Sequence, residues 1–351
     1  VWMKRDDREG HTLVLGTTRV GKTRLAELHI AQDIRRGDVV IVIDPKGDAD
    51  LLKRVHTEAA ATGRLSDLVI FHLGFPELSA RYNAIGRFSR ITEVATRIAN
   101  QLPSEGNSAA FKEFAWRFVN IIARALVSLG EQPNFERIRR YINDIEPLFI
   151  RYARYWLSAN GDDDWQQSVE SLATKVSNRN VPQAMRGRQN DAIGLYQDLQ
   201  RRGIYEPVLD GLMSTFKYDR SYFDKIVGSV GPLLEKLCSG AVAELLSPRV
   251  GDQRPILDWM DVARRRGIVY VGLDALSDTT VAGAVGNAMF ADLVSAAGYI
   301  YKHGLGNDRE AVPTISLHAD EFNELIGDEF VPLLNKAGGA GFQVTAYTQT
   351  W

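Results

Sequence analysis

Residues Gly16–Thr23 read GTTRVGKT, which matches the pattern G-x-x-x-x-G-K-[S/T] of a phosphate-binding loop. Glycine lets the backbone wrap closely around a polyphosphate, with its N–H groups pointing inward. Lys22 brings a positive charge to the β- and γ-phosphates, and the hydroxyl of Thr23 is suited to ligate Mg²⁺. We therefore predict a site for ATP with Mg²⁺, contacted by nine consecutive residues: Gly16, Thr17, Thr18, Arg19, Val20, Gly21, Lys22, Thr23 and Arg24.

The residues around the loop favour this interpretation over a chance match in a glycine-containing turn. Thr12–Leu15 is a short apolar strand candidate, and Thr23–Arg35 carries apolar residues at helical spacing. The loop is thus expected to open a helix, whose N-terminus itself attracts anions.

Two carboxylates follow a later strand candidate, Thr314–Leu317. In phosphate-loop ATPases the first acid of such a pair holds the Mg²⁺ shell, and the second polarises the attacking water. We expect this strand to lie beside the loop strand, with Asp320 and Thr23 as metal ligands and Glu321 as general base. Because Asp-Glu pairs are common in proteins, this interpretation depends on the phosphate loop.

Gln349 follows the last strand candidate, Phe342–Thr348. A glutamine on a strand next to the carboxylate strand can touch the γ-phosphate, as in RecA-like motors; the alternative is an ordinary polar residue at a strand end. The order of loop, acid pair and glutamine favours such a motor over a small GTPase or a nucleotide kinase. We predict Lys22, Glu321 and Gln349 as the catalytic residues. His318 is expected to pack or hydrogen-bond, because no second His or Cys lies nearby at metal-ligand spacing.

Strand and helix patterns alternate in the first and last parts of the chain, which predicts a parallel sheet with helical crossovers. Fully apolar strands such as VVIVID indicate burial on both faces. The fold class we expect is α/β, a RecA-like P-loop NTPase domain with a mainly parallel sheet, interrupted by an inserted all-α domain. The remaining strand candidates are Val39–Asp44, Leu68–Leu73 and Ile268–Leu273, and the helix candidates are Leu51–Thr62, Thr279–Tyr301 and Phe330–Ala337.

Long helical patterns dominate the middle of the chain, for example Phe111–Leu129 and Phe135–Leu157. Their aromatic residues mostly recur at helical spacing, which favours a buried helical core over stacking on bases. We expect three segments: residues 1–95 with the phosphate loop, an all-α insertion over 96–245, and residues 246–351, the rest of the nucleotide-binding domain, truncated at its C-terminus.

The composition of the 351 residues is ordinary for a globular protein, with 45% hydrophobic and 25% charged residues. The single cysteine, Cys238, lies in an apolar helical pattern and is expected in the core; it allows no disulfide within the chain, which suits a reducing compartment. The sequence contains no uninterrupted apolar run of about 18 residues or more, the length typical of a membrane span.

A formal net charge of −2 excludes a protein that coats nucleic acid over its whole surface. A DNA contact must then come from a local patch or from a channel built by several subunits, and Lys175–Arg202 is the best local candidate. Its first part, Lys175–Arg188, holds four basic residues and no acid, which suits phosphate contacts without base reading. A solvated surface is an equally good interpretation of this charge.

Four motifs, GTTRVGKTRL, DPKGD, HADE and TQT, resemble those of the conjugative coupling proteins of the TraD/TraG type, most closely the integrating-element TraD branch. The resemblance covers essentially the whole chain, including the helical domain between loop and carboxylates. FtsK/HerA translocases share the single motifs, but the spacing and the size of the insertion favour the coupling proteins. Members of this family are hexameric, membrane-anchored ATPases that pump DNA.

The resemblance implies an ATP-hydrolysing DNA translocase that links a relaxosome to a type IV secretion channel in bacterial conjugation. Its expected partners are single- or double-stranded DNA read without sequence preference, relaxosome proteins and channel components. It also implies a homohexamer at full length, possible monomers for this fragment, and a cytoplasmic domain anchored in the bacterial inner membrane by helices expected before this sequence. By resemblance, Gly16–Thr23 bind nucleotide, Thr23 and Asp320 hold Mg²⁺, Glu321 activates water and Gln349 senses phosphate. The turn Asp44–Asp48 also matches the family, with no role assigned beyond a structural turn.

One departure from the family concerns the basic residue that a neighbouring subunit supplies to ATP. Several relatives carry an arginine shortly before the last strand, whereas this chain has no arginine between Asp320 and Gln349 and only one lysine, Lys336. The trans-acting residue is therefore Lys336, one of Arg264–Arg266, or absent. Two other functions stay open: a non-motor docking module that binds nucleotide for assembly and recruits relaxosome or substrate proteins, and an FtsK/HerA-type translocase outside conjugation.

Overall fold

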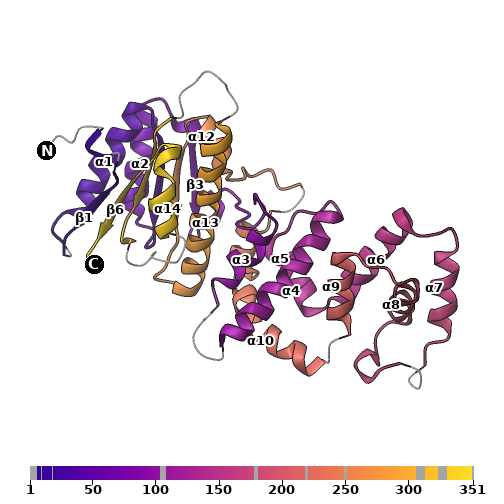
Figure 1. Ribbon diagram of the computed structural model, residues 1–351. Helices are drawn as coiled ribbons and strands as arrows, with labels where there is room; N and C mark the ends of the chain where they lie inside the picture. Colours follow the sequence, from indigo (N-terminus) through magenta and orange to yellow (C-terminus); the bar gives the residue numbers. More distant parts are fainter. Residues whose placement is uncertain are drawn as a thin grey trace. The chain divides into compact units, whose positions relative to one another are not determined.

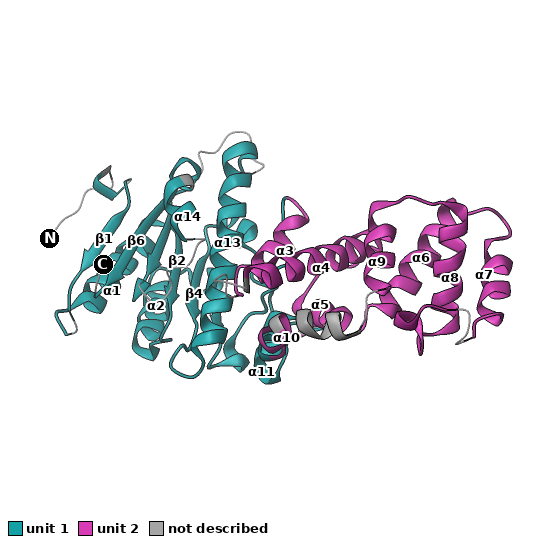
Figure 2. Cartoon of the chain, turned by 60° about the horizontal axis from the view of Figure 1, so that its bottom comes forward, with its two compact units in different colours: residues 1–89, 236–351 teal, residues 90–235 magenta. Residues whose placement is uncertain are grey.

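The computed structural model describes residues 6–8, 10–17, 19–102, 108–177, 181–217, 220–248, 251–305, 313–322 and 330–349. The chain forms two compact units, shown in different colours in Figure 2. The first, here called the sheet unit, comprises Val1–Ser89 and Lys236–Trp351. The second, the helical unit, comprises Arg90–Glu235. The insertion was expected over 96–245, whereas the compact helical unit covers Arg90–Glu235. It begins earlier because α3 (Thr92–Ala99) packs on α4 (Ser108–Ser128).

The sheet unit is built on a six-stranded sheet in which all pairs of neighbouring strands are parallel. This is the α/β arrangement that the alternating patterns predicted. The four central strands are fully buried. Two of them, VVIVID and IVYVG, are almost wholly apolar, as burial on both faces favours, and the other two also bury polar side chains such as His318 and Gln343. In spatial order the strands are β1 (Thr12–Leu15), β6 (Phe342–Thr348), β5 (Ile315–Ala319), β2 (Val39–Asp44), β4 (Ile268–Gly272) and β3 (Leu68–His72).

The acid-pair strand does not lie beside the loop strand, so that expectation was wrong. β6 lies between β1 and β5: Leu15 pairs with Thr348, and Ala319 pairs with Ala346. The physical reason is burial. All seven residues of β6 are buried and need neighbours on both sides, whereas the four residues of β1 alternate between half-buried and exposed, which suits the edge.

Helices cover both faces of this sheet. α1 (Lys22–Arg36) and α2 (Ala49–Ala61) pack together on one face, and α13 (Thr279–His303) and α14 (Phe330–Lys336) pack together on the other (Figure 1). Right-handed crossovers produce this division, because the chain moves along the sheet in one direction through α1 and α2 and returns through α13 and α14. The core under α1 and α2 is fully buried and mostly aliphatic; it includes Ala26, Ile30, Ile34, Val40, Val42, Leu51, Val55 and Ile268, together with Tyr270 and Tyr347.

Among the described residues, α13 is the one helix long and apolar enough to cross a membrane, by length and composition alone. However, 72% of its most apolar window is buried inside the structure, where it packs against α12 (Trp259–Arg264) and α14. Its buried carboxyl group, that of Asp292, accepts a hydrogen bond of 2.9 Å from the hydroxyl of Tyr82. These contacts are typical of a core helix.

The helical unit shows only helices in its described residues. Its core includes the stacked rings of Phe149 and Phe216, whose centroids lie 4.9 Å apart. Of the aromatic residues at helical spacing, Phe118 is buried, whereas Tyr155 is half exposed. After α4 the helices are α5 (Phe135–Asn143), α6 (Glu146–Asn160), α7 (Trp165–Thr174), α8 (Asn190–Arg202), α9 (Pro207–Phe216) and α10 (Arg220–Leu237), which is followed in the sheet unit by α11 (Gly240–Leu246).

Two local expectations fail. Phe135–Leu157 is not one helix, because the chain leaves helical geometry at Asp144, whose carboxylate accepts the N–H of Glu146, and restarts with Pro147 in the first turn of α6. Cys238 lies just after the end of α10 and is only partly buried, so it is not a core residue.

The described residues also include the short 3-10 helices η1 (Asp6–Arg8), η2 (Leu65–Asp67), η3 (Pro76–Leu78), η4 (Gln183–Met185) and η6 (Gly338–Ala340).

Candidate nucleotide-binding site

The phosphate loop connects the carboxyl end of β1 to the first turn of α1. Its first glycine is tied to the neighbouring strand, because the N–H of Gly16 donates to the carbonyl of Thr348 at 3.1 Å. Its second glycine, Gly21, has φ +95° and precedes the helix directly, a conformation that favours glycine. The Nζ of Lys22 donates to the carbonyls of Gly16 and Thr17 at 2.8 and 3.0 Å. The buried lysine is thus held inside the loop.

The space around Gly16 also favours glycine at this position. A Cβ on Gly16 would lie 2.7 Å from Cγ2 of Val20, which is closer than such atoms approach. Val20 itself is exposed, and Arg19 has φ +65°. The Arg24 guanidinium lies on the exposed side of α1 and pairs with Glu27 at 2.9 Å. Thr23 is half-buried, and Thr18 lies outside the described residues.

Asp320 directly follows β5 and carries a buried carboxylate. Its N–H donates to the carbonyl of Ile43 at 3.0 Å, and its Oδ1 accepts the N–H of Glu321 at 3.0 Å. Burial, together with the negative charges of Asp44 and Glu321, raises the pKa of Asp320 to about 6. In the described part of the chain, Asp320 forms no ion pair with a basic side chain.

Glu321 lies between two hydrogen-bond donors. Gln349 Nε2 donates to Oε1 and Oε2 of Glu321 at 2.9 and 3.0 Å, and Lys46 Nζ donates to Oε1 at 2.9 Å. Burial by itself would raise the pKa of Glu321, but the hydrogen bonds from Lys46 and Gln349 and the charges of Lys46 and Lys22 outweigh it and lower the pKa. The carboxylate is therefore held in its ionised form.

Lys46 belongs to the Asp44–Asp48 turn, for which the sequence suggested no chemistry. The structure brings this turn to the site because β2 is the neighbour of β5, so their carboxyl ends meet. The signal that could have found Lys46 is its place: it follows a buried parallel strand, at the edge of the sheet where ligands bind.

No protein-family model matches the chain. One stretch is 24% identical over 144 residues to the type 4 coupling protein DotL of Legionella pneumophila subsp. pneumophila, covering 38% of this chain and 18% of DotL. The bacterial conjugative coupling protein TrwB, in an unbound crystal form, superposes with a TM-score of 0.55 at 14% identity, over 99% of this chain and 64% of that one. The chain has the fold of a type IV coupling protein.

These matches confirm the predicted resemblance to type IV coupling proteins and the predicted α/β, RecA-like fold, whereas the nearer likeness to the integrating-element TraD branch stays a prediction. A complex of TrwB with the GTP analogue GDPNP matches at a TM-score of 0.54 and 15% identity, over all of this chain and 66% of TrwB. TrwB with the ATP analogue ADPNP gives the same TM-score at 14% identity. The chain spans about two thirds of the TrwB chains and about a fifth of DotL.

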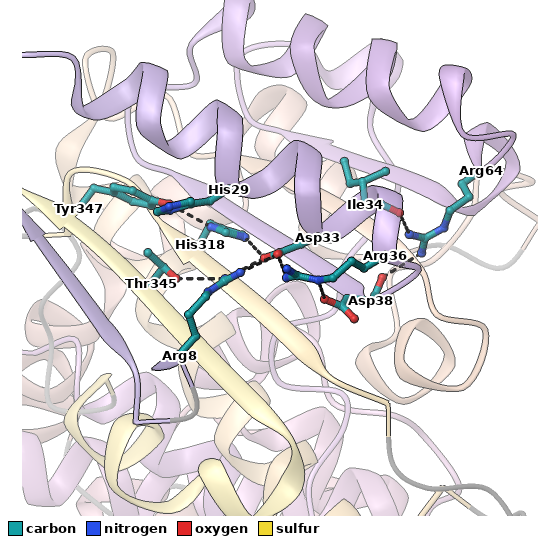
Figure 3. A network of polar contacts seen from close by, with 10 residues as sticks. All are labelled: Arg8, His29, Asp33, Ile34, Arg36, Asp38, Arg64, His318, Thr345 and Tyr347. Atoms are coloured by element: carbon teal, nitrogen blue, oxygen red, sulfur yellow. Dashed lines mark hydrogen bonds and ion pairs between the residues drawn. The ribbon is translucent and has the colours of Figure 1, made fainter. Parts of the chain in front are cut away.

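A second polar cluster of this coupling-protein fold lies beneath α1 and is drawn in Figure 3. At its centre, Asp33 is fully buried; it accepts hydrogen bonds of 2.6 and 2.8 Å from Arg8 and lies 2.9 Å from Nε2 of His318. Arg36 also pairs with this carboxylate. The hydroxyl of Tyr347 lies 3.3 Å from the other ring nitrogen of His318. His318 is thus a hydrogen-bonding residue, as its sequence context predicted.

The remaining predicted residues are the candidate trans-acting cations and the basic stretch. Arg264–Arg266 precede β4 and so lie at the amino ends of the strands, where Arg265 pairs with Asp261 at 3.0 Å. The side chain of Lys336 lies outside the described residues. In the helical unit, Lys175 and Arg186 are exposed.

Two other members of the basic stretch differ. Arg188 pairs with Glu146 at 3.5 Å and lies 4.9 Å from the centre of the Phe216 ring. Arg179 is not among the described residues. Lys175 and Arg186 therefore present their charge at the surface, whereas the Arg188 guanidinium contacts other residues of the helical unit.

Proposed function

We propose that this chain is the ATP-hydrolysing part of a coupling protein that moves DNA toward a type IV secretion channel during bacterial conjugation. The observation that carries the proposal is the meeting of Glu321 with Gln349 at the carboxyl edge of the sheet, whose edge strand β1 leads into the phosphate loop with Lys22. The binding of GTP and ATP analogues by TrwB, which shares the fold, supports a nucleotide site here.

The chain's own residues have distinct roles in this proposal. The N–H groups of the loop and Lys22 bind the phosphates and stabilise the charge that develops on them. Glu321, which is held ionised, takes the proton of the attacking water. Gln349 contacts the γ-phosphate and, through its hydrogen bond to Glu321, transmits the state of the site to β6.

The donor set also fits Mg²⁺. Oxygen ligands are those this ion prefers, and Thr23 with Asp320 supply a hydroxyl and a carboxylate. Asp320 is buried beside two further carboxylates and has a raised pKa, an arrangement that a divalent cation would relieve. When bound, the ion would supply charge neutralisation to the phosphates.

We further propose partners and assembly by analogy with the family. The full-length protein forms a homohexamer on the inner membrane, contacts DNA without reading its sequence, and receives it from relaxosome proteins. Lys175 and Arg186 contribute to DNA binding because their charge is exposed. Lys336 or one of Arg264–Arg266 reaches the ATP of a neighbouring subunit.

The test is ATP hydrolysis by this chain and by the full-length protein, with and without Mg²⁺, single-stranded DNA and double-stranded DNA. We expect Mg²⁺-dependent turnover that DNA stimulates. Nucleotide binding with no turnover under any of these conditions would instead identify a docking module that uses nucleotide for assembly.

A further inference from the structure

We propose that Lys46 is a positioning residue for the ATPase reaction: it fixes the carboxylate of Glu321 in the orientation that accepts the proton of the attacking water. This role rests on the proposed ATPase function. Its basis is the contact of 2.9 Å between Lys46 Nζ and Oε1 of Glu321, which joins residues 275 positions apart in the sequence.

The turn that carries Lys46 is itself held by a buried carboxylate. Asp44 is 1% exposed; its Oδ1 accepts the N–H of Lys46 at 2.9 Å, and its Oδ2 accepts the N–H of Asp48 at 2.6 Å. The hydroxyl of Tyr270, on the neighbouring strand β4, donates to Oδ2 of Asp44 at 2.7 Å and to the carbonyl of Asp48 at 3.1 Å. The hydrogen bonds of Asp44 and Tyr270 therefore hold the backbone of the turn, and this fixes the position from which the Lys46 side chain extends.

The geometry of Glu321 explains why its carboxylate needs a second hydrogen-bond donor besides Gln349 to hold its orientation. Its backbone has φ +40°, a left-handed conformation that is unfavourable for a residue other than glycine and persists only where the surroundings enforce it. Gln349, at the end of β6, donates from one neighbouring strand, and Lys46 donates from the other. With donors on both flanks of β5, the carboxylate cannot rotate freely about its terminal bonds.

Two other roles for Lys46 make different predictions. A lysine that binds a nucleotide phosphate contributes to ground-state affinity, so its loss raises KM or the Kd of the nucleotide. A lysine that only pairs with Glu321 for stability leaves both kinetic constants unchanged. A positioning lysine acts on a group that works in the transition state, so its loss lowers kcat and leaves KM unchanged.

The experiment measures steady-state ATP hydrolysis for wild type and for Lys46→Met, Lys46→Arg and Lys53→Met. Methionine keeps most of the length of the unbranched side chain and removes its charge. Lys53 is a matched control, because it lies on α2 with its side chain 77% exposed and pairs at the surface with Asp50 at 3.5 Å. Thermal unfolding and binding of a non-hydrolysable ATP analogue show that each variant is folded.

For Lys46→Met we expect kcat to fall about tenfold to a hundredfold, as for a misplaced catalytic group, with KM within about twofold of wild type. Lys46→Arg should recover most of this loss, and Lys53→Met should match wild type. In a second arm, Tyr270→Phe removes the hydroxyl that holds the turn and should lower kcat by less than Lys46→Met does, again at constant KM.

The inference is overturned if wild type is active and Lys46→Met has the same kcat as wild type. It is equally overturned if Lys46→Met raises KM and leaves kcat unchanged. It is also overturned if arginine fails to recover activity that methionine loses. If wild type binds the analogue but hydrolyses no ATP with or without DNA, the proposed ATPase function fails as well, so the two failures are distinguishable.

Discussion

Two buried aspartates of the sheet unit lie in opposite electrostatic surroundings. The carboxylate of Asp33 contacts the guanidinium groups of Arg8 and Arg36 and the imidazole ring of His318. Burial alone would raise its pKa, but the hydrogen bonds from His318 and Arg8 more than offset burial and hold the pKa far below the usual range. Asp320 accepts the N–H of Glu321 and meets negative charge, and its pKa is raised.

The contrast separates a structural cluster from a site. A buried carboxylate with its partners complete holds secondary-structure elements together, and breaking it leaves other charges unpaired. A buried carboxylate that faces further carboxylates costs stability and persists where a ligand or a reaction uses it. The cluster around Asp33 therefore explains how α1 is attached to β5 and β6, whereas Asp320 points to the chemistry.

The largest expected effect is on turnover at the site. Glu321→Gln should lower ATP hydrolysis by about a hundredfold or more, because an amide cannot take a proton from water. Nucleotide binding and the midpoint of thermal unfolding should stay near wild type. Lys22→Ala should instead weaken nucleotide binding, since the charge facing the phosphates is lost. Normal turnover by the Glu321 variant would show that another group is the base.

The second effect is on stability, at Asp33. Asp33→Asn should lower the free energy of unfolding by about 3 to 5 kcal/mol, the typical cost of removing one partner of a buried pair. Because the folded pKa lies below the unfolded one, the aspartate stabilises fully above the unfolded value, and this contribution is lost as the pH falls through the folded pKa. The deficit of the variant should thus shrink in acid, as measured by urea unfolding from pH 7 downward.

Substitution of Asp320 should change the free energy of unfolding in the opposite direction to substitution of Asp33. Without metal, Asp320→Asn should raise the free energy of unfolding by about 1 to 3 kcal/mol above pH 6, because the shift of its pKa to about 6 measures the cost of ionising it in the fold. Below about pH 3 the Asp320 carboxyl group of wild type is protonated in both the folded and the unfolded state, so the gain should vanish there. If Asp320→Asn is less stable than wild type at pH 7.5, the contrast with Asp33 is wrong. If its Mg²⁺-dependent ATP hydrolysis is unimpaired, Asp320 is not a ligand of Mg²⁺.

The smallest effect extends the comparison to the helical unit. Replacing Lys175 and Arg186 by serine should leave stability unchanged, because both are exposed, and should flatten the salt dependence of DNA binding by roughly 0.9 log units per lost duplex contact. Arg117→Ser, on the exposed side of α4, is the matched control. An unchanged slope would place the DNA contact elsewhere in the chain.

The sequence by itself determined the parts that depend on near neighbours. The strand–loop–helix unit around Gly16–Thr23 is set by a short motif and local periodicity, and β2 and β6 have the bounds that their apolar runs predicted. The class of the fold followed from the alternation of such units. Even the local break at Asp144 was open to detection, because Pro147 is visible in the sequence.

Only the tertiary structure decided which of these units are neighbours. The order of strands depends on burial summed over the whole sheet, which is why β6 lies between β1 and β5. For the same reason no local pattern joins Lys46 to Glu321 or Arg8 to Asp33. The sequence specified the chemical groups, and the pairing of distant strands and helices determined which group contacts which, because burial and electrostatic interactions act through space and not along the chain.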